Sequence, residues 1–92
     1  MIREAVRRID DNLRGRATVS SERLVGAPFN TRLDMAVEML DAGESLVALE
    51  NLCSNVYEYG ISLTPGEYEA IKSAAAEVGM SREHVKPLAE LV

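Results

Sequence analysis

Residues 31–60 carry two helical patterns separated by only three residues, and this spacing restricts the fold more than any other feature of the sequence. In residues 31–41, apolar side chains cover most of the helical circumference and leave a single strip of acidic side chains. Helices joined by so short a corner, Ala42-Gly43-Glu44, must be antiparallel neighbours. We therefore predict a helical hairpin whose first helix is surrounded at the centre of the domain.

The second helix of this hairpin is predicted from Glu44 or Ser45 to Tyr59. Its apolar positions recur with the helical period and form the expected inward face: Leu46, Leu49, Leu52, Cys53 and Val56. Gly43 before it and Gly60 after it allow the chain to reverse direction.

Two further long helices are predicted on either side of the hairpin. Residues 2–14 place an apolar residue every three or four positions and stop at Gly15. Thr64-Pro65-Gly66-Glu67 combines a threonine cap, a proline at the first helical position and a glutamate for a capping box, so a helix should run from there to residue 78.

The remaining segments predict only short helical pieces. Ser20 or Ser21 could cap one turn ending at Val25 within residues 15–30, with Leu24, Val25 and Phe29 as the expected anchors to the core. Asn30 or Thr31 is the expected cap of the helix that follows. A last segment begins at Ser81 and is interrupted by Pro87.

Length and composition agree with an all-α fold. Ninety-two residues make one domain, residues 1–92, and the low aromatic content of 4% requires an aliphatic core. We predict a compact bundle of four main helices plus short helical segments.

Charge and cysteine content exclude several classes of protein. A net charge of −5 argues against binding nucleic acid through phosphate neutralisation. No apolar run is long enough to span a membrane, and the amphipathic start contains no signal-peptide core. A single cysteine excludes an internal disulfide and suits a reducing compartment, so a cytoplasmic location is expected.

The sequence contains none of the usual combinations of catalytic residues. His84 stands alone in a polar context, and Cys53 lies on an apolar helical face with no cation near it in sequence. There is no metal-binding spacing and no phosphate-binding glycine loop. We predict a protein that is not an enzyme and that has no metal or cofactor.

The acidic strip is the candidate binding site. Eight acidic residues and no lysine or arginine occur between residues 33 and 69, whereas residues 1–32 carry seven arginines and four acids. The basic segment should complement the acidic one internally, and charge runs on helices commonly face only water. A surface of one sign with tyrosines at its edge nevertheless suits a basic protein partner. The residues predicted to contact it are Asp34, Glu38, Asp41, Glu50, Tyr57 and Glu58.

Residues 42–71, AGESLVALENLCSNVYEYGISLTPGEYEAI, resemble the core of the MafI-type bacterial immunity proteins. The similarity rests on the A-G-E corner, the A-L-E-N-L-C run, the Y-E helix end, I-S-L-T and the E-Y-E-A-I helix. The segment Arg14–Phe29 departs from the family pattern by being longer and more basic. The resemblance implies a cytosolic protein that binds and neutralises a cognate toxin. Many such toxins are nucleases with a basic substrate groove.

Two other functions remain possible from the residues alone. The chain could be a scaffold that self-associates through methionine-bearing helix faces. Residues 64–92 could also form a DNA-binding helix-turn-helix, although Lys72, Arg82 and Lys86 are balanced there by Glu77, Glu83 and Glu90.

Overall fold

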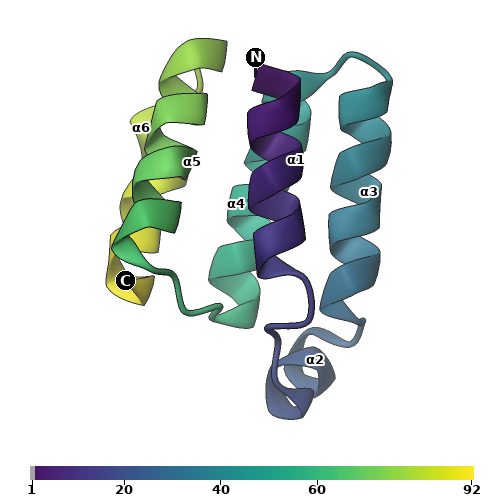
Figure 1. Cartoon of the computed structure of the whole chain (residues 1–92). Helices are drawn as coiled ribbons and strands as arrows, with labels where there is room; N and C mark the ends of the chain where they lie inside the picture. The colour runs from purple at the N-terminus through teal and green to yellow at the C-terminus, as the bar shows by residue number, and fades with distance from the viewer. Residues whose placement is uncertain (1) are drawn as a thin grey trace.

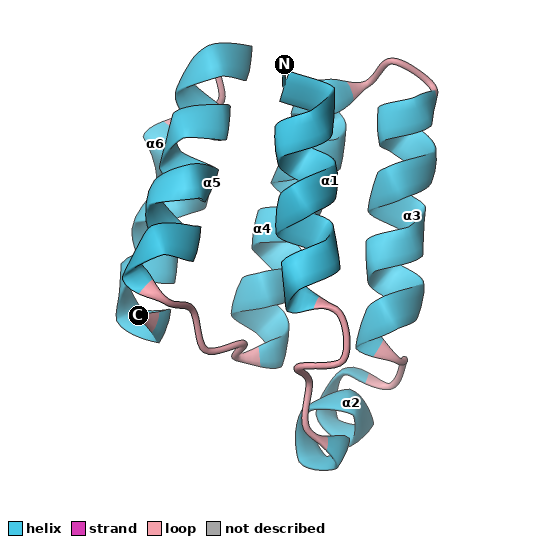
Figure 2. Ribbon diagram, viewed as in Figure 1, coloured by secondary structure: helices cyan, strands magenta, loops and turns pink. Residues whose placement is uncertain are grey.

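The part of the chain that the structure describes forms seven helical segments, joined by short connections (Figures 1 and 2). The computed structural model describes residues 2–92, and no strand occurs among them. The α-helices are α1 (Ile2–Leu13), α2 (Val19–Val25), α3 (Phe29–Asp41), α4 (Ser45–Tyr59), α5 (Pro65–Val78) and α6 (Arg82–Val85), and a 3₁₀ helix, η1 (Lys86–Leu91), follows.

The prediction of an all-α fold is confirmed. The prediction was four main helices plus short helical segments, and the described residues form six α-helices and one 3₁₀ helix: α1, α3, α4 and α5 have 12–15 residues, and α2, α6 and η1 are shorter. The helix after Ser81 becomes a 3₁₀ helix at Lys86, next to the ring of Pro87. Proline cannot donate the backbone hydrogen bond that would continue an α-helix.

A side-chain cap marks the start of three of the described helices, α2, α5 and α6. At α5 the predicted capping box is present: the Thr64 hydroxyl accepts from the Glu67 amide at 3.1 Å, and Glu67 Oε1 accepts from the Thr64 amide at 2.9 Å. Helix α2 is capped by Thr18, which means that the prediction of Ser20 or Ser21 was wrong.

The predicted cap of α3 was also wrong, because the helix begins at Phe29, before Asn30 and Thr31. Pro28 occupies the cap position, and its side chain cannot accept a hydrogen bond. The Glu22 carboxylate from α2 accepts from the Phe29 amide at 3.1 Å instead. A distant carboxylate thus replaces the local cap, which sequence alone does not reveal.

The hairpin of α3 and α4 is antiparallel, as predicted, with Gly43 in the left-handed conformation at φ 84° between the two helices (Figure 1). The central helix, however, is α4 and not α3. Helix α4 contacts α1, α2, α3, α5, α6 and η1, whereas α3 packs mainly on α4 and α1. The broad apolar surface of α3 is therefore only partly covered, and Met35 stays 44% exposed.

The core fills the space between α1, α3, α4 and α5 and is mostly aliphatic. Two aromatic rings are exceptions: Phe29 and Tyr59 are buried with ring centroids 5.0 Å apart. The Tyr59 hydroxyl donates to the Ala27 carbonyl oxygen at 2.7 Å, which ties α4 to the connection between α2 and α3.

Helix α2 projects from one end of the bundle and buries none of its own side chains (Figure 1). Of the three predicted core anchors in this region, Phe29 is fully buried and Val25 packs against the core, but Leu24 is 88% exposed. The prediction for Leu24 was wrong, because a helix of only two turns can turn a single edge toward the bundle. None of the described helices is long and apolar enough to cross a membrane.

Candidate protein-binding surface

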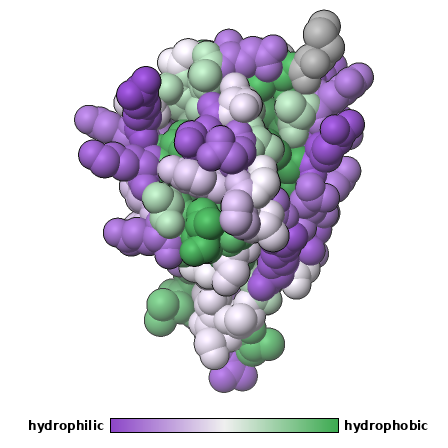
Figure 3. All heavy atoms as spheres, turned by 60° about the vertical axis from the view of Figure 1, so that its left-hand side comes forward, coloured by the Kyte–Doolittle hydropathy of each residue, from purple (hydrophilic) through white to green (hydrophobic). Residues whose placement is uncertain are grey.

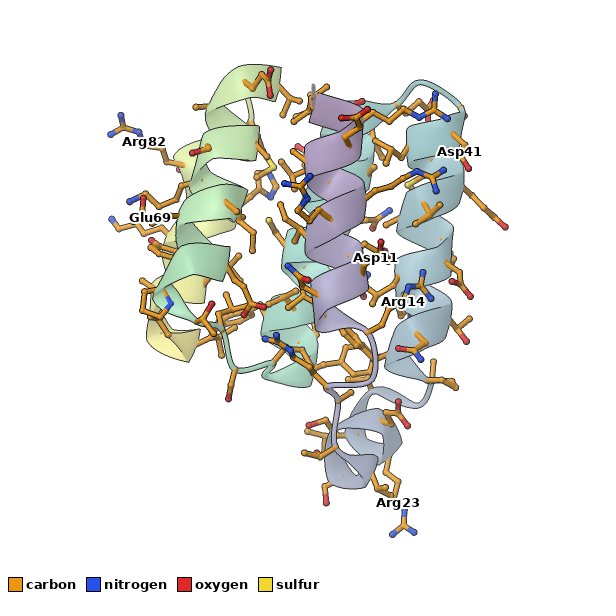
Figure 4. The ribbon with its side chains drawn as sticks, in the orientation of Figure 1. Asp11, Arg14, Arg23, Asp41, Glu69 and Arg82 are labelled. Carbon is orange, nitrogen blue, oxygen red and sulfur yellow. The ribbon has the colours of Figure 1, made fainter. Side chains whose placement is uncertain are left out.

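The arginines of α1 occupy part of the predicted acidic strip. Arg3 and Arg7 both reach Asp41 Oδ1, with nitrogen–oxygen distances of 2.7 and 2.5 Å. Asp41 lies at the end of α3 beside α1 (Figure 4). These two hydrogen bonds, Arg3 first, hold the pKa of the Asp41 carboxyl below its ordinary value. Internal complementarity between the basic segment and the acidic one is therefore present at this position.

Arg14 also connects α1 with α3. It pairs with a carboxylate of each helix, Asp10 of α1 and Asp34 of α3. Its Nε lies 2.7 Å from Asp10 Oδ1, and its terminal nitrogen lies 2.7 Å from Asp34 Oδ1. Asp10 is only 2% exposed, and its second oxygen has no hydrogen-bond partner among the described residues. Burial raises the pKa of Asp10, although the hydrogen bond and the charge of Arg14 oppose this shift.

Five of the six predicted contact residues fall into two groups, and Glu38, exposed on α3, belongs to neither. Asp34 and Asp41 face α1; Asp41 is paired with arginines of α1, and Asp34 with Arg14, the residue that follows this helix. Glu50, Tyr57 and Glu58 lie together on the outer side of α4, because their positions fall within about 100° of one another on a helix. The structure does not bring these two groups into one continuous acidic strip.

The α4 carboxylates are less neutralised than those of α3. Glu50 Oε2 lies 3.3 Å from His84 Nε2, a partner that is charged only when protonated. Glu58 is exposed and has no ion-pair partner in residues 2–92. The same holds for Glu38, which points outward from α3. Among the carboxylates of α3 and α4, those of Glu38, Glu50 and Glu58 are therefore the ones available to a partner.

Large apolar side chains are exposed beside these carboxylates. Seven large hydrophobic residues are exposed in the described chain, and four of them belong to the hairpin: Met35, Leu46, Val47 and Tyr57. Leu46 had been predicted to face the core, but it is 39% exposed at the first turn of α4. We refer to these four residues, together with Glu38, Glu50 and Glu58, as the hairpin surface.

Two buried residues of consequence were not predicted. Asp10 lies next to Ile9 and four residues after Val6, so it falls on the apolar face of the helix, and an arginine follows it four residues later. This position on the apolar face was the sequence feature that indicated burial of Asp10. The sequence predicts tyrosines at the edge of the acidic surface, but Tyr59 is 1% exposed. No feature of the sequence indicates that the carbonyl of Ala27 lies close enough to accept its hydrogen bond.

The single cysteine is buried, as predicted from its apolar helical face. Burial, together with the nearby charge of Glu50, raises the pKa of Cys53 to about 12. Because the thiolate is the reactive form, we expect the native protein to resist alkylation by iodoacetamide at pH 8 and to react fully in 6 M guanidinium chloride. Mass spectrometry of the alkylated protein measures this. Rapid native labelling would show that the helix opens locally around this position.

No group of three or more His, Cys, Asp or Glu side chains within residues 2–92 is arranged to hold a metal ion. Comparison of the chain with protein-family models, with curated proteins and with solved structures gave no match.

Proposed function

We propose that this protein is an immunity protein of the MafI type, which binds a toxin with a basic surface and neutralises it without catalysis. The observation that supports the proposal best is the hairpin surface, where exposed apolar side chains stand beside carboxylates. Protein interfaces combine these two features: apolar anchors supply affinity, and charge of one sign raises the association rate with a partner of opposite sign.

The size of the molecule is compatible with such a complex. Its accessible surface is 5431 Å², and a standard interface needs about 800 Å² from each partner. We place the contact on α4 and the adjoining side of α3, because Asp34 and Asp41 are already paired with Arg14 and with the α1 arginines Arg3 and Arg7. Tyr57, half exposed, is the proposed anchor. The toxin would be inhibited when this surface covers its substrate groove or the entrance to it.

The scaffold alternative has less support from the charges. A homodimer formed through the hairpin surface would bring Glu38, Glu50 and Glu58 of both copies together, and like charges at an interface are unfavourable. Sedimentation of the protein alone tests this alternative: a dimer whose fraction rises with concentration, and which Tyr57→Ala abolishes, would favour self-association over toxin binding.

The proposed function predicts two separable effects of substitution on the complex with the protein encoded by the adjacent gene. Tyr57→Ala should weaken the complex at least 30-fold, mainly by faster dissociation, because truncating an anchor costs about 2 kcal/mol or more. Glu58→Lys should mainly slow association, and this loss should shrink at high salt. Surface plasmon resonance at two salt concentrations measures both rates.

A matched control is Glu77→Lys on α5, which makes the same charge change at an exposed residue outside the hairpin surface. It should leave both rates within about twofold, since surface substitutions away from an interface change free energies by less than about 0.5 kcal/mol. Equal effects of Glu58→Lys and Glu77→Lys would reject the hairpin surface as the site. If no complex forms with the adjacent gene product, although the strain still needs this protein for survival, then that product is not the partner.

A further inference from the structure

A second surface, which shares no residue with the hairpin surface, lies between α5 and α6. It is a groove of about 910 Å³, within the range of about 300–1,000 Å³ common for ligand sites. Its floor is apolar: Ala75, Met80 and Val85 are largely buried there, and Ala76 is exposed at its edge. Figure 3 shows the face formed by these helices, with apolar surface between hydrophilic side chains.

Three cations stand around this groove in a protein whose net charge is −5. Lys72 is paired with Glu69 at 3.2 Å and lies 5.2 Å from the centre of the Tyr68 ring. Arg82 and Lys86 have no ion-pair partner within the described chain, and Arg82 extends away from the bundle (Figure 4). Glu83 is the one acidic residue among those that line the groove, which leaves the rim positive.

The spacing of the two unpaired cations adds to this argument. Arg82 and Lys86 are four residues apart, so their side chains lie on the same side of the helical turn. Like charges at this spacing destabilise a helix by a few tenths of a kcal/mol. A ligand that carries carboxylates would remove this repulsion.

We propose that the groove between α5 and α6 binds an acidic amphipathic helix of a protein partner. An apolar groove between two helices accepts the apolar stripe of a third helix, and the exposed Ala76 allows its backbone to approach closely. Carboxylates on both sides of that stripe would meet Arg82 and Lys86 on one wall and Lys72 on the other. The groove would thus serve a partner, or a partner segment, of opposite charge to the one bound by the hairpin surface.

The test uses two synthetic helical peptides of about 14 residues with the same leucine stripe, one flanked by glutamates and the other by lysines. The glutamate peptide is expected to bind the full-length protein at least tenfold tighter than its lysine twin by fluorescence anisotropy. Amide shifts in ¹⁵N spectra should concentrate at Ala76, Met80 and Val85. Equal affinity for the two peptides, shifts located elsewhere, or no binding at millimolar concentration would overturn the proposal.

The double substitution Arg82→Glu and Lys86→Glu should reduce binding of the glutamate peptide at least tenfold and should enhance binding of the lysine twin. The double substitution Arg8→Glu and Arg23→Glu, at exposed arginines of α1 and α2, makes the same change in net charge and should alter neither affinity by more than about twofold. Equal losses of affinity in the two double variants would show that the effect depends only on net charge, and they would overturn the proposed site. If the protein binds a DNA duplex at low salt, and the double substitution Arg82→Glu and Lys86→Glu abolishes this binding, the ligand of the groove would be nucleic acid and not a helix.

Discussion

Replacing Tyr59 by alanine is expected to lower the free energy of unfolding by about 3–5 kcal/mol, the range found for removal of a buried aromatic side chain. The ring is 1% exposed and packs on Phe29, and its hydroxyl holds the carbonyl of Ala27. A chain of 92 residues has a total stability of about 5–14 kcal/mol, so the variant would lie near the limit of folding. Urea denaturation followed by circular dichroism measures the change.

Two control variants separate the parts of this effect. Tyr59→Phe keeps the ring and removes only the hydrogen bond, so it should cost about 1–2 kcal/mol. Tyr57→Ala, two residues earlier and half exposed, should change stability by less than about 0.5 kcal/mol. If Tyr59→Ala were as mild as Tyr57→Ala, the packing of α4 against the α2–α3 connection would be wrong.

Replacing Arg14 by methionine should destabilise the protein by about 2–4 kcal/mol at pH 7, because it leaves Asp10 buried without a cation. Most surface arginines contribute far less, so Arg8→Met, on the exposed side of the same helix, is the matched control and should cost less than about 0.5 kcal/mol. Urea denaturation of the three proteins at pH 7 gives the comparison.

The pH dependence of this destabilisation follows from the raised pKa of Asp10. A carboxyl whose folded pKa exceeds its unfolded value stabilises the protein fully below the unfolded pKa, and this contribution is lost as the pH rises through the folded pKa. Removing Arg14 should raise the folded pKa of Asp10 further, since its cation is gone. The stability difference between Arg14→Met and the parent should therefore narrow as the pH is lowered and Asp10 takes up a proton. A difference that stays constant with pH would show that Arg14 acts through packing and not through the Asp10 charge.

Helical periodicity and capping residues predicted most of the architecture. The four long helices, the antiparallel hairpin and the start of α5 all follow from local sequence, since an amphipathic period and a capping box act within a few residues. The prediction that α3 is the central helix was wrong for a physical reason. A wide apolar arc shows that a helix has much surface to cover, but it does not show how many neighbours will cover it, and α3 lies at the edge with Met35 exposed.

The sequence predicted the candidate site less well than it predicted the fold. The absence of lysine and arginine between residues 33 and 69 is a fact of the linear chain, whereas the cations that neutralise Asp34 and Asp41 arrive from α1 through the fold. Sequence also could not separate Leu46 from the other leucines of α4, because its exposure depends on where the neighbouring helices end. The outer carboxylates Glu50 and Glu58 and the exposed ring of Tyr57 were identified from helical phase alone.

Helix α4 contacts all other helical elements and also carries most of the hairpin surface. A partner that binds the exposed side of α4 therefore binds the same helix against which the hydrophobic core packs. Complex formation and resistance to unfolding are then thermodynamically linked: at a free partner concentration of 1,000 times the dissociation constant, the bound state gains about 4 kcal/mol. The melting temperature would rise accordingly, so thermal shift offers a way to detect a cognate ligand before anything is known of its chemistry.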